Sequence, residues 1–379
     1  MSILIGADIV PTKNNLEQFE KGDIDSLVGE HISSLFKEAD YRILNLEVPL
    51  ADRATPIDKG GHNMIAPTAS AAAIKALGVD LLTLCNNHIL DQGAEGLTST
   101  IDCLDDLGIA HVGAGESLEA ARVPFYFTQG GRKIGVYACA EHEYSIASPT
   151  RAGANPFDPL ESLDHINDAK GQCDYLIVLY HGGKEHYRYP SPNLQRTCRK
   201  IVEKGADLVI CQHSHCVGCE ERYRGATIVY GQGNFLFDLC SNEYWDSSIL
   251  VRLSDDFSID YIPIVRHENA VRLASEADAQ RILGDFERRS EEITQEDFVA
   301  KRYREFAKRA TGYYFLEFTG RPLSMFVFRV LNRLSGQRLR ENYAFARSYK
   351  GRHWKSVRNY IECEAHRELI LSAMSEDDE

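Results

Sequence analysis

The sequence lacks an apolar run long enough to cross a membrane. Its longest apolar runs, such as Tyr175 to Tyr180, fall far short of the roughly 20 residues that a membrane-spanning helix needs, and the mean hydropathy is −0.31. The first residues, Met1 to Gly6, reach strand-like apolar sequence at once, without a basic region or a small-residue cleavage site. We therefore expect a soluble protein that stays in the cytoplasm.

The sequence also lacks the regular cysteine spacing of a disulfide scaffold. Its ten cysteines are scattered irregularly from Cys85 to Cys363, and in a chain of 379 residues without an export signal they are expected to be reduced thiols. Cys216 and Cys219 have the spacing of a zinc clamp or a redox pair, but only Cys240 follows before Cys363. Without a second pair, this spacing is a weak indication of zinc.

Basic residues are fewer than acidic residues, and they are unevenly distributed along the chain. The 42 Lys and Arg against 56 Asp and Glu give a net charge of −14, so we expect no nucleic-acid partner. Residues 321–360, however, hold ten Lys and Arg and one acidic residue, Glu341, interleaved with aromatic residues. Two interpretations stay open: helices whose aromatic side chains pack on the core, or a dock for an anionic polymer, an acidic glycan or the inner face of an anionic membrane.

The periodicity of the chain predicts an α/β fold followed by a helical appendage. Up to about residue 265, apolar strand candidates alternate with helices over 66–77, 94–107 and 192–204. The last strands follow one another without a helix, which favours two packed sheets. We expect domains at 1–267 and 268–379, the second helical over 274–293, 294–310, 322–334 and 353–374. The strand candidates are 2–7, 42–46, 80–85, 109–112, 123–127, 133–139, 174–180, 207–211, 226–230, 248–253 and 258–264.

Side chains that bind metals follow five of the predicted strands. Because the carboxyl ends of strands in an open α/β sheet share one edge, residues far apart in sequence converge there. Carboxylates, an amide oxygen and imidazoles suit Mn, Fe, Zn or Ni better than Ca or Mg, and two ions could share the Glu47 carboxylate. The pattern therefore predicts a hydrolytic metal site. The residues at these strand ends are Asp8, Glu47, Asn87, His88, His181, His213 and His215.

Short motifs surround the residues at these strand ends and continue over residues 3–240. They are Gly6-Ala7-Asp8, Asn45-Leu46-Glu47-Val48-Pro49-Leu50, Asn86-Asn87-His88-Ile89-Leu90-Asp91-Gln92-Gly93, Gly113-Ala114-Gly115, His181-Gly182-Gly183-Lys184-Glu185, Gly205-Ala206-Asp207-Leu208-Val209-Ile210, His213-Ser214-His215 and Tyr230-Gly231-Gln232-Gly233-Asn234-Phe235. In sequence and in order, these motifs resemble the CapA family of poly-γ-glutamate capsule synthesis proteins, a branch of the calcineurin-like metallophosphoesterase superfamily. The fold that this resemblance implies is a β-sandwich flanked by helices.

The resemblance implies a role for each of these polar residues. His88 would be the general acid near the leaving group, and Asp91 would orient its ring. Val10 stands where the superfamily has a histidine ligand, so one ion is expected to bind weakly or not at all, and Glu47 replaces the usual Asp. One or two divalent transition-metal ions (Mn, Fe or Zn) are implied. Their implied ligands are Asp8, Glu47, Asn87, His181, His213 and His215.

Four further residues are candidates for substrate binding. Glu185 and His186 lie close to His181 in sequence and would either contact substrate or be solvated. His142 is either a residue at the rim of the site or, as we favour, a surface histidine. Asn234 belongs either to the site or to a turn between strands.

These observations favour a metal-dependent hydrolase of capsule or cell-surface polymer synthesis or processing. Its substrate would be an anionic polymer or glycan, cleaved at a phosphoester, a γ-glutamyl amide or a glycan-linked ester. The alternative is a non-catalytic assembly protein that keeps the fold, with one ion or none, inside a capsule synthesis complex. Val10 favours that alternative, whereas the pair of His88 and Asp91 favours the enzyme.

Overall fold

The computed structural model describes residues 2–238, 242–317, 327, 330, 331, 334 and 352–374. The chain divides into two compact units, Met1–Val299 and Ala300–Glu379. The first unit contains both large sheets and all the residues expected to bind metal.

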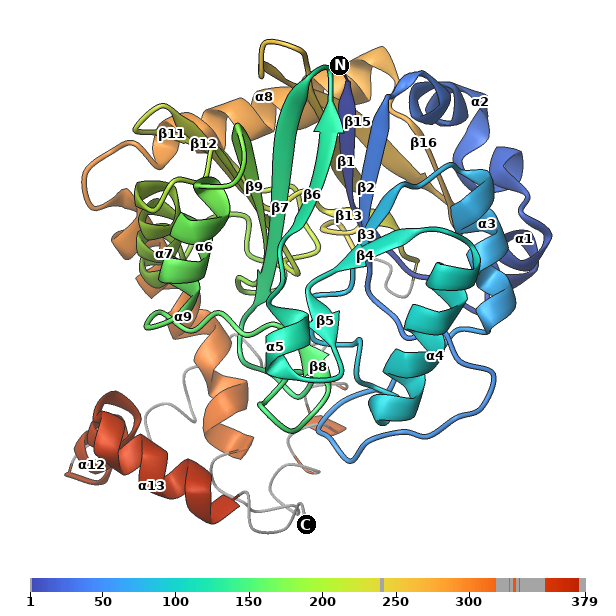
Figure 1. Ribbon diagram of the computed structural model, residues 1–379. Helices are drawn as coiled ribbons and strands as arrows, with labels where there is room; N and C mark the ends of the chain where they lie inside the picture. The colour runs from blue at the N-terminus through green and yellow to red at the C-terminus, as the bar shows by residue number, and fades with distance from the viewer. Residues whose placement is uncertain are drawn as a thin grey trace. The chain divides into compact units, whose positions relative to one another are not determined.

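Two large sheets and one two-stranded ribbon form the first unit (Figure 1). The six-stranded sheet has the order β11 (Glu220–Tyr223), β12 (Ala226–Tyr230), β10 (Leu208–Gln212), β9 (Tyr175–His181), β7 (Arg132–Ala140), β6 (Phe125–Gln129). The ribbon pairs β5 (Ala114–Gly115) with β8 (Gly153–Ala154). The eight-stranded sheet has the order β16 (Ala270–Leu273), β15 (Ile259–His267), β14 (Ser247–Leu253), β1 (Ile3–Ile9), β2 (Tyr41–Leu46), β3 (Leu81–Thr83), β4 (Ala110–Val112), with β13 (Asn234–Leu236) also paired to β1.

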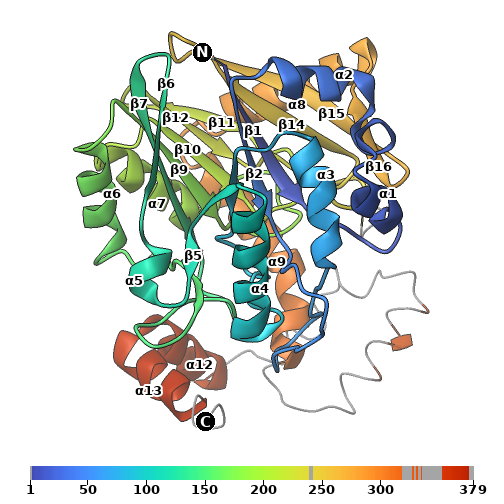
Figure 2. The same ribbon diagram turned by 45° about the vertical axis from the view of Figure 1, so that its right-hand side comes forward.

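Helices cover the outer faces of the two sheets, as Figures 1 and 2 show. Beside the six-stranded sheet lie α6 (Ser162–Lys170) and α7 (Pro192–Glu203), and α5 (Leu118–Ala121) lies beside the ribbon. α8 (Glu276–Glu292) packs against β15 and β11, and α9 (Phe298–Glu317) follows it. Beside the eight-stranded sheet lie α1 (Leu16–Lys21), α2 (Ile24–Glu38), the 3-10 turn η1 (Thr68–Ser70), α3 (Ala71–Ala76) and α4 (Gly93–Asp106).

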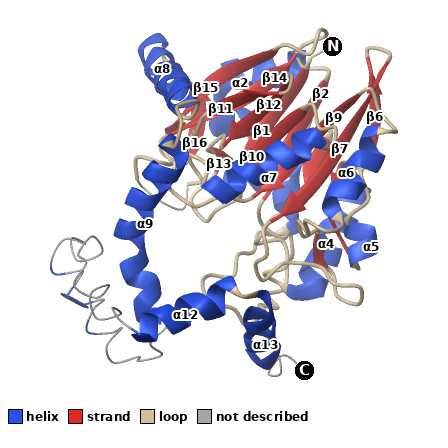
Figure 3. Ribbon diagram, turned by 90° about the vertical axis from the view of Figure 1, so that its left-hand side faces the viewer, coloured by secondary structure: helices blue, strands red, loops and turns tan. Residues whose placement is uncertain are grey.

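The alternation of side chains along β9 separates two apolar clusters. Ile177 and Leu179 join the large core that includes residues of both sheets. Leu176 and Val178 face the other way, into a smaller cluster with residues of α6 and α7. Since successive strand side chains point to opposite faces, His181 at the end of β9 continues the series that faces the space between the sheets. Figure 3 shows the two sheets with α6 and α7 outside them.

The expected α/β sandwich flanked by helices is confirmed. Every predicted strand is present, and α3, α4 and α7 occupy the predicted ranges. α7 begins as its sequence indicates, because Ser191 Oγ accepts a hydrogen bond from the Leu194 amide at 3.0 Å. The short strands β5, β8, β11, β13 and β16, of two to four residues each, were not predicted.

The end of the first unit differs from the expected boundary at 267/268. The unit continues to Val299, because β16 pairs with β15 and α8 packs on that strand. The helix expected over 353–374 is two helices, α12 (Arg352–Glu362) and α13 (Glu364–Met374). Of the helix expected over 322–334, only positions 327, 330, 331 and 334 belong to the described residues. None of the described helices combines the length and hydropathy needed to cross a membrane.

Candidate metal centre

The predicted convergence at the strand ends is present in the structure. β1 and β2 are parallel neighbours with Asp8 in register with Asn45, and Glu47 follows the end of β2. In the other sheet, His181 at the end of β9 is in register with Gln212 of β10, and His213 follows. The carboxyl ends of strands from both sheets therefore supply the side chains of one buried site.

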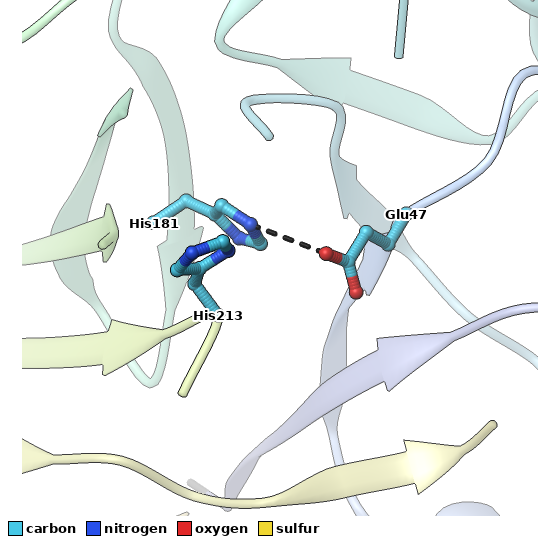
Figure 4. A group of neighbouring side chains, drawn as sticks. All are labelled: Glu47, His181 and His213. Atoms are coloured by element: carbon cyan, nitrogen blue, oxygen red, sulfur yellow. Dashed lines mark ion pairs between the residues drawn. The ribbon is translucent and has the colours of Figure 1, made fainter. Parts of the chain in front are cut away.

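Two groups of buried side chains share the Glu47 carboxylate. The first is Glu47, His181 and His213, and the second is Asp8, Glu47 and His215. In each group, one possible ligand atom per residue lies within 4.8 Å of the others. Figure 4 shows the first group, in which the imidazoles of His181 and His213 face the carboxylate from the opposite sheet. Nε2 of His181 is 3.3 Å from Oε1 of Glu47.

Asn87 lies beside the first group. Its Oδ1 lies 3.0 Å from Nε2 of His181, the atom that also faces Glu47. On its other side, Nδ2 of Asn87 donates a hydrogen bond to Oε2 of Glu143 at 3.0 Å. Asn87 thus lies next to the group predicted to contain it, with its carbonyl oxygen directed inward.

The second group is surrounded by polar side chains from the eight-stranded sheet. Nδ1 of His215 lies 3.6 Å from Oδ2 of Asp8 and 2.8 Å from Oδ1 of Asn234. Nδ2 of Asn45 donates to the other oxygen of Asp8 at 2.7 Å. Val10 is buried and offers no ligand atom. The second group therefore has one ligand fewer than the superfamily pattern implies.

Several buried polar atoms of the two groups have no hydrogen-bond partner. Burying a polar atom without a partner is costly, and for a carboxylate the cost is larger still. A divalent cation held between these groups would contact the free carboxylate oxygens, which Nε2 of His181 already faces, so the donor set fits a transition-metal ion. Among the described residues, the atoms without a hydrogen bond include Oδ2 of Asp8, both oxygens of Glu47, and Nδ1 of His181 and His213.

The electrostatics of the two carboxylates are unequal. Burial acts to raise the pKa of Glu47, but the neighbouring His215 and His181 outweigh it and lower the pKa well below its ordinary value. Burial and the charge of Glu47 raise the pKa of Asp8. Burial alone would lower the pKa of His215, but the carboxylates of Glu47 and Asp8 raise it to about 9. Glu47 is thus the carboxylate that holds its negative charge most firmly.

The loop that carries two of the histidines has an unusual backbone. His213 and His215 have φ angles of 78° and 53°, in the left-handed region that side chains rarely adopt. Such conformations cost of order 1–3 kcal/mol each and are concentrated at functional sites. Gly231 lets a neighbouring turn approach closely, since a Cβ there would lie 2.7 Å from Oγ of Ser214. The surrounding fold therefore keeps His213 and His215 in backbone conformations that these residues rarely adopt on their own.

His88 and Asp91 form the expected pair beside the first group. Nδ1 of His88 lies 2.7 Å from Oδ2 of Asp91, and the His88 side chain is 21% exposed. Nζ of Lys59 contacts the other Asp91 oxygen, and the Met64 amide donates to Oδ2 at 2.7 Å. The Lys59 and Asp91 side chains are 4% and 0% exposed, so their ion pair is buried.

The four candidate substrate-binding residues have different positions. Glu185 and His142 are exposed. His186 is partly buried, and its Nε2 accepts a hydrogen bond from Nε1 of Trp245 at 2.9 Å. The Trp245 ring lies 4.7 Å from that of His215, so His186 is close to the second group. Asn234 begins β13 and contacts His215 directly, so it lies at the second group.

Glu143 and Lys59 also contact residues of the site, although neither was predicted from the sequence. Glu143 follows β7, and its Oε1 lies 3.7 Å from Nε2 of His213, so the rule applied to the other strand ends could have found it. Lys59 lies in a loop without periodic pattern, and nothing in the sequence connects it to Asp91. The two candidate groups among the described residues contain no cysteine, so the zinc clamp suggested by Cys216 and Cys219 gains no support.

Comparisons with known proteins agree on the first two thirds of the chain. A family model described as bacterial capsule synthesis protein PGA_cap matches residues 2–239. The capsule biosynthesis protein CapA of Bacillus anthracis is 29% identical over 269 residues, 67% of this chain and 65% of that protein. The PGA biosynthesis protein CapA of Bacillus subtilis is 27% identical and covers 61% and 62% of the two chains. The chain thus spans less than two thirds of the length of these relatives.

Solved structures with a similar fold include a phosphatase from Mycoplasma pneumoniae and a 5′-nucleotidase precursor from Thermus thermophilus. The phosphatase has a TM-score of 0.44 and 15% identity and covers 71% of this chain and 94% of its own. The 5′-nucleotidase precursor has a TM-score of 0.40 and 13% identity and covers 76% and 58%. The family model matches well over half of the sequence, and the chain therefore belongs to the family of bacterial capsule synthesis proteins described as PGA_cap.

Proposed function

We propose that this protein is a metal-dependent hydrolase of capsule or cell-surface polymer synthesis or processing. The observation that supports the proposal best is the pair of buried groups that share Glu47, in each of which one possible ligand atom per residue lies within 4.8 Å of the others. The relatives are named as capsule biosynthesis and PGA biosynthesis proteins, and these names indicate that the polymer is PGA or another capsule polymer.

The first group would hold the more firmly bound ion. Its residues are Glu47, Asn87, His181 and His213, a mixed oxygen and nitrogen set that suits Mn, Fe or Zn. Asp8, Glu47 and His215 would hold a second, weaker ion, because Val10 replaces a ligand there. Bound divalent ions of this kind supply Lewis-acid activation of water and neutralise negative charge on the reacting group.

His88 would supply a proton to the leaving group. Its ring is held through Nδ1 by Asp91, which leaves Nε2 as the atom that can donate. The ring is partly exposed while Asp91 is fully buried, so a substrate can reach the imidazole but not the carboxylate that orients it. A phosphoester, a γ-glutamyl amide and a glycan-linked ester are all compatible with this arrangement.

The proposed substrate is an anionic polymer or glycan, and the proposed docking segment is 321–360. Capsule synthesis partners or the inner face of an anionic membrane are further proposed contacts of that segment, and the proposed location is cytoplasmic. Most of the segment lies outside the described residues. Within it, the described apolar side chains of Val327, Val330, Leu331 and Leu334 are exposed by 41% to 80%.

Elemental analysis and a substrate screen test the proposal together. The full chain, purified without added metal, should carry Mn, Fe or Zn, and it should hydrolyse members of a panel of phosphoesters and γ-glutamyl compounds. Asp8→Asn with Glu47→Gln should remove both the metal and the hydrolysis. A chain that holds no metal and hydrolyses nothing after addition of Mn, Fe and Zn would contradict the proposal.

A second candidate function is a non-catalytic assembly role in a capsule synthesis complex. The buried Val10, which leaves the second group one ligand short, favours it. In that case the chain would bind metal and remain inactive on every substrate, and replacing His88 would leave polymer assembly unchanged.

A further inference from the structure

The loop after β7 touches the candidate metal centre at several points. Oε2 of Glu143 accepts a hydrogen bond from Nδ2 of Asn87 at 3.0 Å, and Oε1 lies 3.7 Å from Nε2 of His213. Oγ of Ser145 donates a hydrogen bond to the main-chain carbonyl of Asn87 at 2.8 Å and accepts one from the main-chain amide of Leu90 at 3.2 Å. One short loop thus holds both the side chain and the main chain of the segment around Asn87.

Ser145 is itself firmly placed. It is completely buried, and its carbonyl accepts a hydrogen bond from the Ala154 amide at 2.7 Å. A Cβ at Gly153 would lie 2.4 Å from that same carbonyl oxygen, so the neighbouring strand packs against it without room for a side chain. Ser145 therefore fixes the main chain, and the orientation of the Asn87 amide depends on Glu143.

The chemistry of Glu143 selects one of two amide orientations. The two ends of a primary amide have nearly the same shape, but one end only donates hydrogen bonds and the other only accepts them. An ionised carboxylate accepts only, so Glu143 requires the NH₂ end of Asn87 to face it. The opposite end, Oδ1, then faces His181 Nε2 at 3.0 Å, and it is the only end of the amide that can bind a metal ion.

We infer that Glu143 is a positioning residue, which orients Asn87 so that its carbonyl oxygen is presented to the ion of the first group. The inference rests on the proposed function, because it assumes that the first group binds metal. Residues that orient a ligand from outside the coordination shell commonly change metal affinity by about 10–100-fold when they are replaced. The Glu143 side chain is 41% exposed, so its replacement should not disturb the core.

Titration of the full chain with Mn²⁺ alone, by calorimetry, tests this role. Glu143→Gln keeps the shape of the side chain but can also donate, so either orientation of Asn87 becomes possible. We expect Glu143→Gln to weaken Mn²⁺ binding at the tighter site by about 10–100-fold. Glu116→Gln, the same change at an exposed carboxylate, should leave the affinity unchanged.

A double-mutant cycle separates orientation from a simple effect of charge. In an Asn87→Ala background, Glu143→Gln should cause no further loss, because Glu143 acts through Asn87. Unchanged affinity in Glu143→Gln would overturn the inference, and so would an equal loss in the Asn87→Ala background, which would make Glu143 a direct ligand or a source of charge. If the unaltered chain binds no Mn²⁺, Zn²⁺ or Fe²⁺, the proposed function fails and the inference with it.

Discussion

Lys59 and His88 both contact the buried carboxylate of Asp91, one at each oxygen. Nδ1 of His88 lies 2.7 Å from Oδ2, and Nζ of Lys59 contacts Oδ1 and lies 3.4 Å from the same His88 nitrogen. A carboxylate that is fully buried needs such partners to keep its charge. The loop that carries Lys59 thereby stabilises the group that orients the proposed general acid.

Replacing His88 should affect chemistry rather than metal binding. His88→Asn removes the proton donor, and general acid–base catalysis typically contributes about 10²–10⁴-fold in turnover. We therefore expect turnover to fall by about that factor while the metal content, measured by elemental analysis, stays at the wild-type value. Loss of metal together with activity would instead place His88 among the ligands.

Replacing Lys59 should destabilise the fold. Lys59→Met leaves the Asp91 charge buried without its cation, and breaking a buried ion pair in this way costs about 3–5 kcal/mol. Urea denaturation measures the free energy of unfolding. Lys59→Met combined with Asp91→Asn should recover part of the loss, because no charge then remains, and Lys37→Met at an exposed lysine should change little. Equal stability of Lys59→Met and the wild type would show that the ion pair contributes nothing.

Acid should weaken the contact between His186 and Trp245. Burial lowers the pKa of His186, although Glu185 acts in the opposite direction. The folded protein thus binds this proton less readily than the unfolded chain, whose histidine has a pKa of about 6.5. The stability that His186 contributes is therefore complete above pH about 6.5 and is lost as the pH falls through the folded pKa.

The melting temperature and Trp245 fluorescence report this transition. Protonation of His186 removes the acceptor for Trp245, so both signals should change on acidification. His186→Gln keeps an acceptor and does not titrate, and it should lose less stability over the same range. The same acid dependence in His186→Gln would assign the transition to another group.

The basic segment 321–360 should give salt-dependent binding. Its ten Lys and Arg against one acidic residue should attract anionic vesicles or acidic polymers. Since the Debye length falls from about 10 Å at 0.1 M salt to about 3 Å at 1 M, sedimentation with anionic vesicles should decrease steeply over that range. Neutral vesicles are the control. Binding that does not depend on salt, or that survives deletion of 321–360, would contradict the docking role.

The sequence predicted that these side chains lie close together because one geometric rule connects them. Asp8, Glu47, His181 and His213 all lie at or just after carboxyl ends of strands, and this edge of the sheets is shared whatever the details of packing. The rule needs only the strands, and long buried strands such as β9 are visible in the sequence.

The supporting residues were harder to predict. Lys59 reaches Asp91 from an irregular loop, and the path of such a loop depends on tertiary contacts rather than on a local pattern. Trp245 lies next to His215 because β14 returns to β1, a pairing between residues that are far apart in the chain. The extension of the first unit to Val299 was missed because the sequence predicts the helix over 274–293 but not its packing on β15.

The most direct test of the account is the number of ions bound when Glu47 is replaced, since its carboxylate belongs to both groups. Calorimetric titration of the full chain with Mn²⁺ should show one tighter site and at most one weaker site. Glu47→Ala should abolish both, His215→Ala should leave the tighter site in place, and all three proteins should have similar circular dichroism spectra. If Glu47→Ala binds Mn²⁺ as the wild type does, Glu47 does not hold the metal and the central claim is wrong.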